Sequence, residues 1–168
     1  MSDKQITDFY RDALGIKTNE KEIYLRAVTH KSYNNSTNNE RLEFLGDAVL
    51  DLIVSQQLFV KNKDANEGFL SIEKSKYVSR ENLNKVAERI LNKNVIKHKS
   101  NYLSENMLGN TLESIIGAIY IDKGILACEK FILKHILQFK TERVLSKNLF
   151  KIINKFFYDK KTKVNRRP

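Results

Sequence analysis

Four acidic residues lie inside an apolar segment of the chain, NNERLEFLGDAVLDLIV, which covers residues 38–54. They are Glu40, Glu43, Asp47 and Asp51. At about 100° per residue on a helix they form a stripe roughly 80° wide, here called the acidic stripe. Like charges three and four residues apart repel each other, and more strongly where burial lowers the dielectric. The spacing therefore predicts a helix that is buried on its other sides and whose acids require a cation.

A fifth acid stands in a similar setting. Glu113 lies in the nearly uncharged segment NTLESIIGAIYIDKG, and Asn110 precedes it by three residues, so both side chains lie on one helix face. Small residues on the two predicted helices would let them approach closely: Gly46, Ala48, Gly117 and Ala118. If the helices cross there, the acids of one helix would meet Asn110 and Glu113 of the other.

Four oxygen donors would converge at such a crossing: Glu43, Asp47, Asn110 and Glu113. An all-oxygen set favours Mg²⁺ or Mn²⁺. Zinc and di-iron sites normally recruit histidine, and His30, His98 and His135 show no E-x-x-H spacing. Hard divalent ions beside an electropositive surface indicate phosphate chemistry, in which metal ions activate a water and stabilise the attacking and leaving oxygens.

Plainer interpretations of these acids stay open. The acidic stripe could be the solvated face of an amphipathic helix, although such a face is usually wider and mixes lysine with glutamate. Thr37 and Glu40 fit the capping box T-x-x-E, and Asn110 and Glu113 fit a similar N-x-x-E cap at a helix start.

The elements that must position these residues are predicted to be helices. The chain has one proline and six glycines, and no segment alternates in the manner of a strand. Residues 69–92 form either two helices or one helix with a bend near Ser79. The other predicted helices cover residues 4–14, 20–30, 38–60, 110–124, 125–141 and 146–158.

Composition bounds the class of protein. A length of 168 residues suits one domain, and the net charge of +10 lies almost wholly after residue 127. Such a basic segment attracts polyanions, although a merely solvated lysine-rich tail is the alternative. With a single cysteine, Cys128, disulfides and a cysteine zinc site are excluded. No secretory signal and no bilayer-crossing run is apparent, so we expect a cytoplasmic protein without a membrane partner.

Several motifs resemble those of ribonuclease III, a family of double-stranded-RNA endonucleases. NNERLEFLGDAVLDL is similar to the family signature. THKSY precedes it, NEGFLSIEKSKYVS follows it, and GNTLESIIGAIYIDKG is similar to the second acidic motif. The resemblance covers roughly residues 20–140.

The resemblance implies an all-α, multi-helical endonuclease fold that works as a homodimer around an RNA duplex. Cleavage would leave 5′-phosphate and 3′-hydroxyl ends. Glu43, Asp47, Asn110 and Glu113 match the metal-binding positions, with Asp47 and Glu113 as the catalytic residues. Glu40 and Glu67 match acids that support the site or the subunit contact. Phe44 matches an aromatic that packs across the dimer interface, with ordinary core packing as its alternative.

The chain departs from the family pattern in two places. The family usually has aspartate where this chain has Asn110, so we expect weaker metal binding or a shifted metal preference. Residues 1–145 match the catalytic domain, whereas the basic residues 146–168 are too short for the double-stranded-RNA-binding domain that most bacterial members append. They resemble only its opening helix and could supply nonspecific phosphate contacts. The RNA-binding residues cannot be identified from the sequence.

The leading hypothesis is a Mg²⁺-dependent, or Mn²⁺-dependent, endoribonuclease that processes ribosomal and other structured RNA, without a small-molecule cofactor. The alternative is a catalytically weak or inactive relative that binds RNA or the ribosome. A helical adaptor for other proteins leaves the acidic stripe unexplained.

Overall fold

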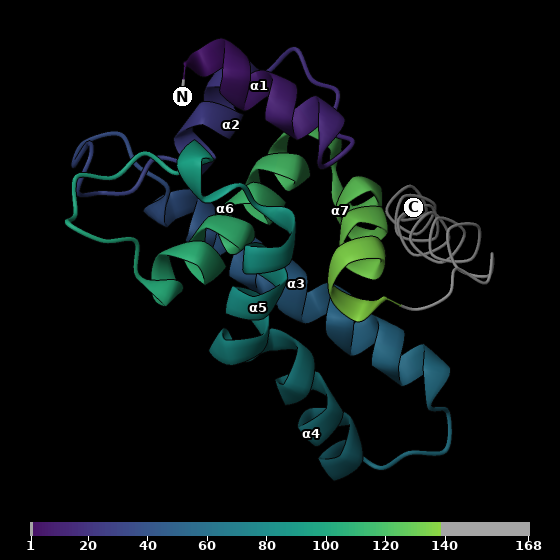
Figure 1. Ribbon diagram of the computed structural model, residues 1–168. Coiled ribbons are helices and arrows are strands. Elements are labelled where there is room, and N and C mark those ends of the chain that lie inside the picture. Colours follow the sequence, from purple (N-terminus) through teal and green to yellow (C-terminus); the bar gives the residue numbers. More distant parts are fainter. Residues whose placement is uncertain (1, 139–168) are drawn as a thin grey trace, which may run out of the picture. The chain divides into compact units, whose positions relative to one another are not determined.

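The computed structural model describes residues 2–138, and all its regular elements are helices (Figure 1). A single parallel bridge between Thr29 and Lys97 is the only extended pairing in these residues, which confirms the expected all-α class. The helices are α1 (Asp3–Asp12), α2 (Lys21–Ala27), α3 (Glu40–Lys61), α4 (Glu67–Val78), α5 (Arg80–Ile90), a 3₁₀ turn η1 (Lys93–Val95), α6 (Glu105–Lys123), α7 (Ile125–Ile132) and a π-helical turn η2 (Leu133–Leu137).

The core forms around the pairing of α3 with α6, the most extensive contact between any two helices of residues 2–138. The aliphatic side chains that these two helices bury completely or almost completely include Leu50, Ile53, Val54, Leu112, Ile115, Ile116 and Ile119. Helices α2, α5 and α7 pack onto α6 around this pair. In Figure 1, α4 projects from the other helices, and none of its residues is buried.

Local sequence explains where the helices begin and end. Ser79 is extended, ends α4 and begins α5 by accepting a hydrogen bond from the Asn82 amide, so residues 69–92 belong to two helices. Gly124 ends α6 with a φ of 75°, a conformation that glycine adopts without strain. The predicted helix over 146–158 and the end of 125–141 lie outside the described residues.

The predicted helix start at residue 110 and both capping interpretations, at Asn110 and at Thr37, are wrong. Helix α6 begins five residues before Asn110, and Ser104 caps it by accepting from the Met107 amide. Asn110 is therefore inside the helix and is not its cap. At the start of α3, Asn39 occupies the cap position without a side-chain hydrogen bond, so Thr37 and Glu40 form no capping box.

The outer side of α3 also differs from the expectation of a helix buried on most sides. Ala48 and Leu52 are exposed together with Phe44 and Phe59. These four residues follow each other at helical spacing and define what we call the outer face of α3. No helix within residues 2–138 is long and apolar enough to span a membrane.

Candidate active site

The crossing of α3 and α6 brings two backbones into direct contact. A Cβ atom built on Gly46 would lie 1.8 Å from the Glu113 carbonyl oxygen, and one built on Gly117 would lie 2.2 Å from the Leu42 carbonyl oxygen. Only glycine permits this approach, which confirms the expected role of Gly46 and Gly117. The exposed Ala48 takes no part in the crossing.

This crossing places the acids of α3 beside Glu113 of α6. Glu113 is only 3% exposed. Burial is the largest influence on this carboxyl and raises its pKa to about 7, while Arg80 pulls the pKa down and the carboxylates of Asp47 and Glu43 push it up. Burial likewise raises the pKa of Glu43. Helices α3 and α6 therefore contribute carboxylates that act on one another.

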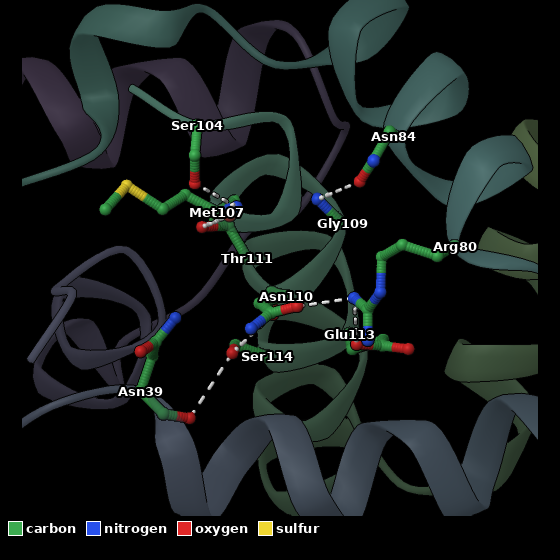
Figure 2. A network of polar contacts seen from close by, with 10 residues as sticks. All are labelled: Asn39, Arg80, Asn84, Ser104, Met107, Gly109, Asn110, Thr111, Glu113 and Ser114. Atoms are coloured by element: carbon green, nitrogen blue, oxygen red, sulfur yellow. Dashed lines mark hydrogen bonds and ion pairs between the residues drawn. The ribbon is translucent and has the colours of Figure 1, made fainter. Parts of the chain in front are cut away.

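Asn110 and Arg80 complete the group, as Figure 2 shows for the side of α6. The guanidinium Nη1 of Arg80 donates to Oδ1 of Asn110 and, at 3.2 Å, to Oε2 of Glu113. The Asn110 side chain also lowers the pKa of Glu43 by hydrogen bonding. We call Glu43, Asp47, Asn110 and Glu113 the oxygen cluster, into which Arg80 of α5 inserts its positive charge.

Sequence reasoning missed Arg80. Its partners lie 30 and 33 residues further along the chain, and no periodic pattern connects them. A weak local signal exists, because Arg80 is the first residue of α5, where a cation opposes the helix dipole. A basic residue at a helix start therefore favours a side chain that binds acceptors on another element, as Arg80 does on α6.

The acidic stripe is divided between two environments. Its ends pair with lysines at the surface: Glu40 with Lys31 at 2.9 Å, and Asp51 with Lys74 at 2.8 Å. The solvated-face interpretation therefore fits Glu40 and Asp51. Its middle, Glu43 and Asp47, acts on Glu113 instead. The cation that the stripe was expected to require is supplied in part by protein side chains.

Glu67 lies outside the oxygen cluster. It is the first residue of α4, is exposed, and accepts a hydrogen bond of 2.6 Å from the Ser71 hydroxyl. It also lines a groove between α3 and α4, together with Leu52, Phe59 and Leu70. Phe44 is 81% exposed, so the alternative of ordinary core packing is wrong for this aromatic.

The donor chemistry of the oxygen cluster fits a hard divalent ion, since three carboxylates and one amide oxygen are present. The side chains are not yet arranged around one. Within residues 2–138, no three His, Cys, Asp or Glu side chains stand where they could already hold a metal ion. Arg80 instead binds two of the oxygens, so the residues fit the ion in kind but not in their present arrangement.

Comparison with known proteins identifies relatives of this arrangement. Residues 20–139 match the family model described as ribonuclease-III-like. A protein named ribonuclease 3 from Bacteroides thetaiotaomicron is 42% identical over 138 residues, which are 77% of this chain and 44% of that protein. Ribonuclease 3 from Nitratiruptor is 39% identical over 78% of this chain and 60% of its own length. The chain thus spans about half the length of the curated relatives that it matches.

Solved structures agree with this match. The nuclease domain of ribonuclease III from Campylobacter jejuni superposes with a TM-score of 0.73 at 33% identity, over 80% of this chain and 96% of that domain. A second structure of that domain, which concerns flexibility in a region involved in dimer formation, gives a TM-score of 0.72 at 34% identity, over 78% of this chain and 96% of that domain. From the family match, the identities and the shared helical architecture, we conclude that this chain belongs to the ribonuclease-III-like family and carries the fold of its nuclease domain.

Proposed function

We propose that this chain is a homodimeric endoribonuclease that hydrolyses double-stranded RNA with the help of a divalent metal ion. The observation that carries the proposal is the convergence of Glu43 and Asp47 from α3 with Asn110 and Glu113 from α6. Crowded carboxylates repel one another and destabilise the folded chain, and a bound cation would relieve this repulsion. The relatives' name, ribonuclease 3, supports the reaction class.

Glu43, Asp47, Asn110 and Glu113 would hold the ion, which we take to be Mg²⁺ with Mn²⁺ as a substitute. When bound, such an ion supplies an activated water and stabilises the negative charge that develops on the phosphodiester. Glu113 benefits most from a cation, because its buried carboxyl is ionised with difficulty, as its pKa of about 7 indicates. Asp47 is exposed at the same crossing and would face the substrate side. We therefore assign Asp47 and Glu113 as the catalytic acids.

The substrate that we propose is a duplex, cleaved to 5′-phosphate and 3′-hydroxyl ends. A protein selects RNA duplexes through their A-form shape and 2′-hydroxyls. The basic residues after 127 would add phosphate contacts that raise affinity without selecting a sequence. Ribosomal and other structured precursor RNAs in the cytoplasm are the substrates we expect, and the single buried cysteine, Cys128, suits that reducing compartment.

We propose that a second copy of the chain covers the outer face of α3. Phe44, Leu52 and Phe59 are exposed there, and Phe69 and Ile72 are exposed on the neighbouring α4. Contiguous exposed apolar side chains mark interaction surfaces. The groove between α3 and α4 offers an apolar receptor for the partner's Phe44. Glu67 lines the same groove and would lie at the subunit contact, where Glu40 could assist from the start of α3.

A second candidate is a relative that binds RNA without cleaving it. The contacts of Arg80 with Asn110 and Glu113 favour this candidate, because a permanent guanidinium would exclude a metal ion.

Cleavage of a long RNA duplex by the purified chain distinguishes the two. We expect cleavage with Mg²⁺ and with Mn²⁺ but none with chelator. Glu113→Ala should lower the rate by about 100-fold or more, since a metal ion contributes several kcal/mol to such a reaction. Glu88→Ala is the matched control, because Glu88 is an exposed glutamate of α5 paired only with Lys93 at the surface. Binding of the duplex without cleavage under either ion would favour the second candidate.

A further inference from the structure

Arg80 sits where its charge acts on the whole oxygen cluster. One nitrogen, Nη1, donates to both Asn110 and Glu113 (Figure 2). Of the cations that lower the pKa values of the Glu43 and Glu113 carboxyls, Arg80 has the largest influence. The two oxygens that it binds are the two that α6 would offer to a metal ion.

The structure around Arg80 is built to admit its side chain. A Cβ atom on Gly109 would lie 3.1 Å from Arg80 Nη1 and 2.5 Å from Asn84 Oδ1. Asn84, one turn further along α5, accepts a hydrogen bond of 3.1 Å from the Gly109 amide and fixes α5 against α6. The lack of a side chain at Gly109 therefore leaves the space through which Arg80 reaches the oxygen cluster.

The metal-free protein needs such a cation. A carboxylate as buried as Glu113 is strongly destabilising unless an opposite charge compensates it. Asn110 extends the compensation, because its amide accepts from Arg80 with its oxygen and can donate to Glu43 with its nitrogen. An aspartate at position 110 could accept from Arg80 but could not donate to Glu43. Arg80 and Asn110 thus connect the carboxylates of α3 and α6 without a metal.

We propose that Arg80 is an internal counter-cation, which holds Asn110 and Glu113 in the metal-free protein and is displaced when a divalent ion binds their oxygens. The inference rests on the proposed function. Arg80 and the ion compete because both need the same oxygen lone pairs. Arg80 is 46% exposed, so its side chain has solvent into which it can swing. The observed free energy of ion binding is then the free energy of binding the metal to the oxygens, reduced by the free energy needed to displace Arg80.

The test is calorimetric titration of the full chain with Mn²⁺ in the absence of RNA. Arg80→Met removes the competing charge, and we expect Mn²⁺ to bind roughly tenfold more tightly. Arg80→Lys keeps the charge and should stay near the wild-type affinity. Lys85→Met is the matched control, because Lys85 lies on the same helix, is 69% exposed and pairs only with Glu81. Unchanged or weaker binding by Arg80→Met would overturn the inference.

Thermal unfolding gives a second readout. Arg80→Met should have a lower Tm than the wild type in chelator, because Glu113 loses its partner, and saturating Mn²⁺ should close most of this gap. A gap of the same size with and without Mn²⁺ would contradict displacement. The failures are distinguishable: if neither the wild type nor any variant binds Mn²⁺, the metal site of the proposed function is wrong, whereas equal binding by wild type and Arg80→Met refutes only the role of Arg80.

Discussion

The two sides of α3 differ in how they are completed. On its inner side, Gly46 meets the backbone of α6, and side chains such as Leu50 are fully buried. On its outer side, Phe44 and Leu52 are exposed, and the adjoining α4 buries none of its residues. One side of α3 is thus buried by other helices of the same chain, whereas the opposite side is exposed in the single chain.

The buried and exposed sides of α3 have different roles: the inner side positions the oxygen cluster, and the outer side is available for association with a second copy. The inner side fixes the separation of α3 and α6, and with it the positions of the four donors of the oxygen cluster. The outer side contributes little to the stability of one chain, although burying each of its large apolar side chains would contribute about 1.5–3 kcal/mol. Substitutions on the inner side should therefore affect folding and metal binding, and those on the outer side should affect association.

The largest effect is expected from Gly46→Ala. The added Cβ would lie 1.8 Å from the Glu113 carbonyl oxygen, so the helices must separate, at a cost of at least about 3 kcal/mol in unfolding free energy. Gly68→Ala in α4 is the control, because its Cβ meets nothing closer than 3.6 Å and alanine favours a helix by roughly 0.5–1 kcal/mol. Urea unfolding measures both. Equal effects of the two substitutions would show that the crossing is not tightly packed.

Glu113→Gln should change how stability depends on pH in the metal-free protein. The pKa of Glu113 is about 7 in the folded chain, raised from 4.5. The folded state therefore holds this proton more tightly than the unfolded state. The stability that Glu113 contributes is lost as the pH rises from 4.5 to about 7.

The variant lacks this loss and should be more stable than the wild type, by on the order of 2–3 kcal/mol at about pH 8 and by little at about pH 4. Urea unfolding in chelator across this range is the measurement, with Glu88→Gln as the exposed control. A difference between variant and wild type that does not vary with pH would show that Glu113 titrates normally.

On the outer side, Phe44→Asp should raise the dissociation constant of the dimer by more than about thirtyfold, since it places a charge in an apolar interface. Sedimentation velocity over a range of concentrations measures the change. Tyr102→Asp is the control, because Tyr102 is a comparably exposed aromatic, at 75%, in the loop before α6. A dimer that persists in Phe44→Asp, or that is lost equally in Tyr102→Asp, would remove the outer face of α3 from the interface.

The smallest effect is expected from Asn110→Asp. A fourth carboxylate should lower the Mg²⁺ concentration needed for half-maximal cleavage by about three- to tenfold, because the ion gains one more negative ligand. Asn94→Asp, an exposed change on the turn η1, should leave it unaltered. Much poorer cleavage by Asn110→Asp would mean that residue 110 does not act as a ligand position.

The sequence predicted the inner side of α3 well. The spacing of the acids and the positions of Gly46 and Gly117 are local properties, which helix periodicity converts into a face. The start of α6 was misjudged, because its first turns, ENMLG, lack the apolar repeat that announces a helix, and only the Ser104 cap marks it.

The remaining errors concern interactions that no local pattern contains. Arg80 reaches Asn110 and Glu113 through the packing of α5 on α6, which follows from tertiary structure. The sequence predicts that α3 is buried on every side outside the acidic stripe, yet the apolar Leu52 is exposed in the single chain. In the sequence, an apolar residue that packs against a second copy cannot be distinguished from one that packs in the core.

In the proposed function, α3 and α6 offer their oxygens to one shared ion, and paramagnetic Mn²⁺ can reveal whether both helices contribute to it. In NMR spectra of the labelled chain, we expect substoichiometric Mn²⁺ to broaden the amide signals of Glu43 and Asp47 together with those of Asn110 and Glu113, at the same Mn²⁺ concentration. Glu113→Gln should weaken the broadening on both helices. Broadening that Glu113→Gln leaves unchanged would contradict a shared site.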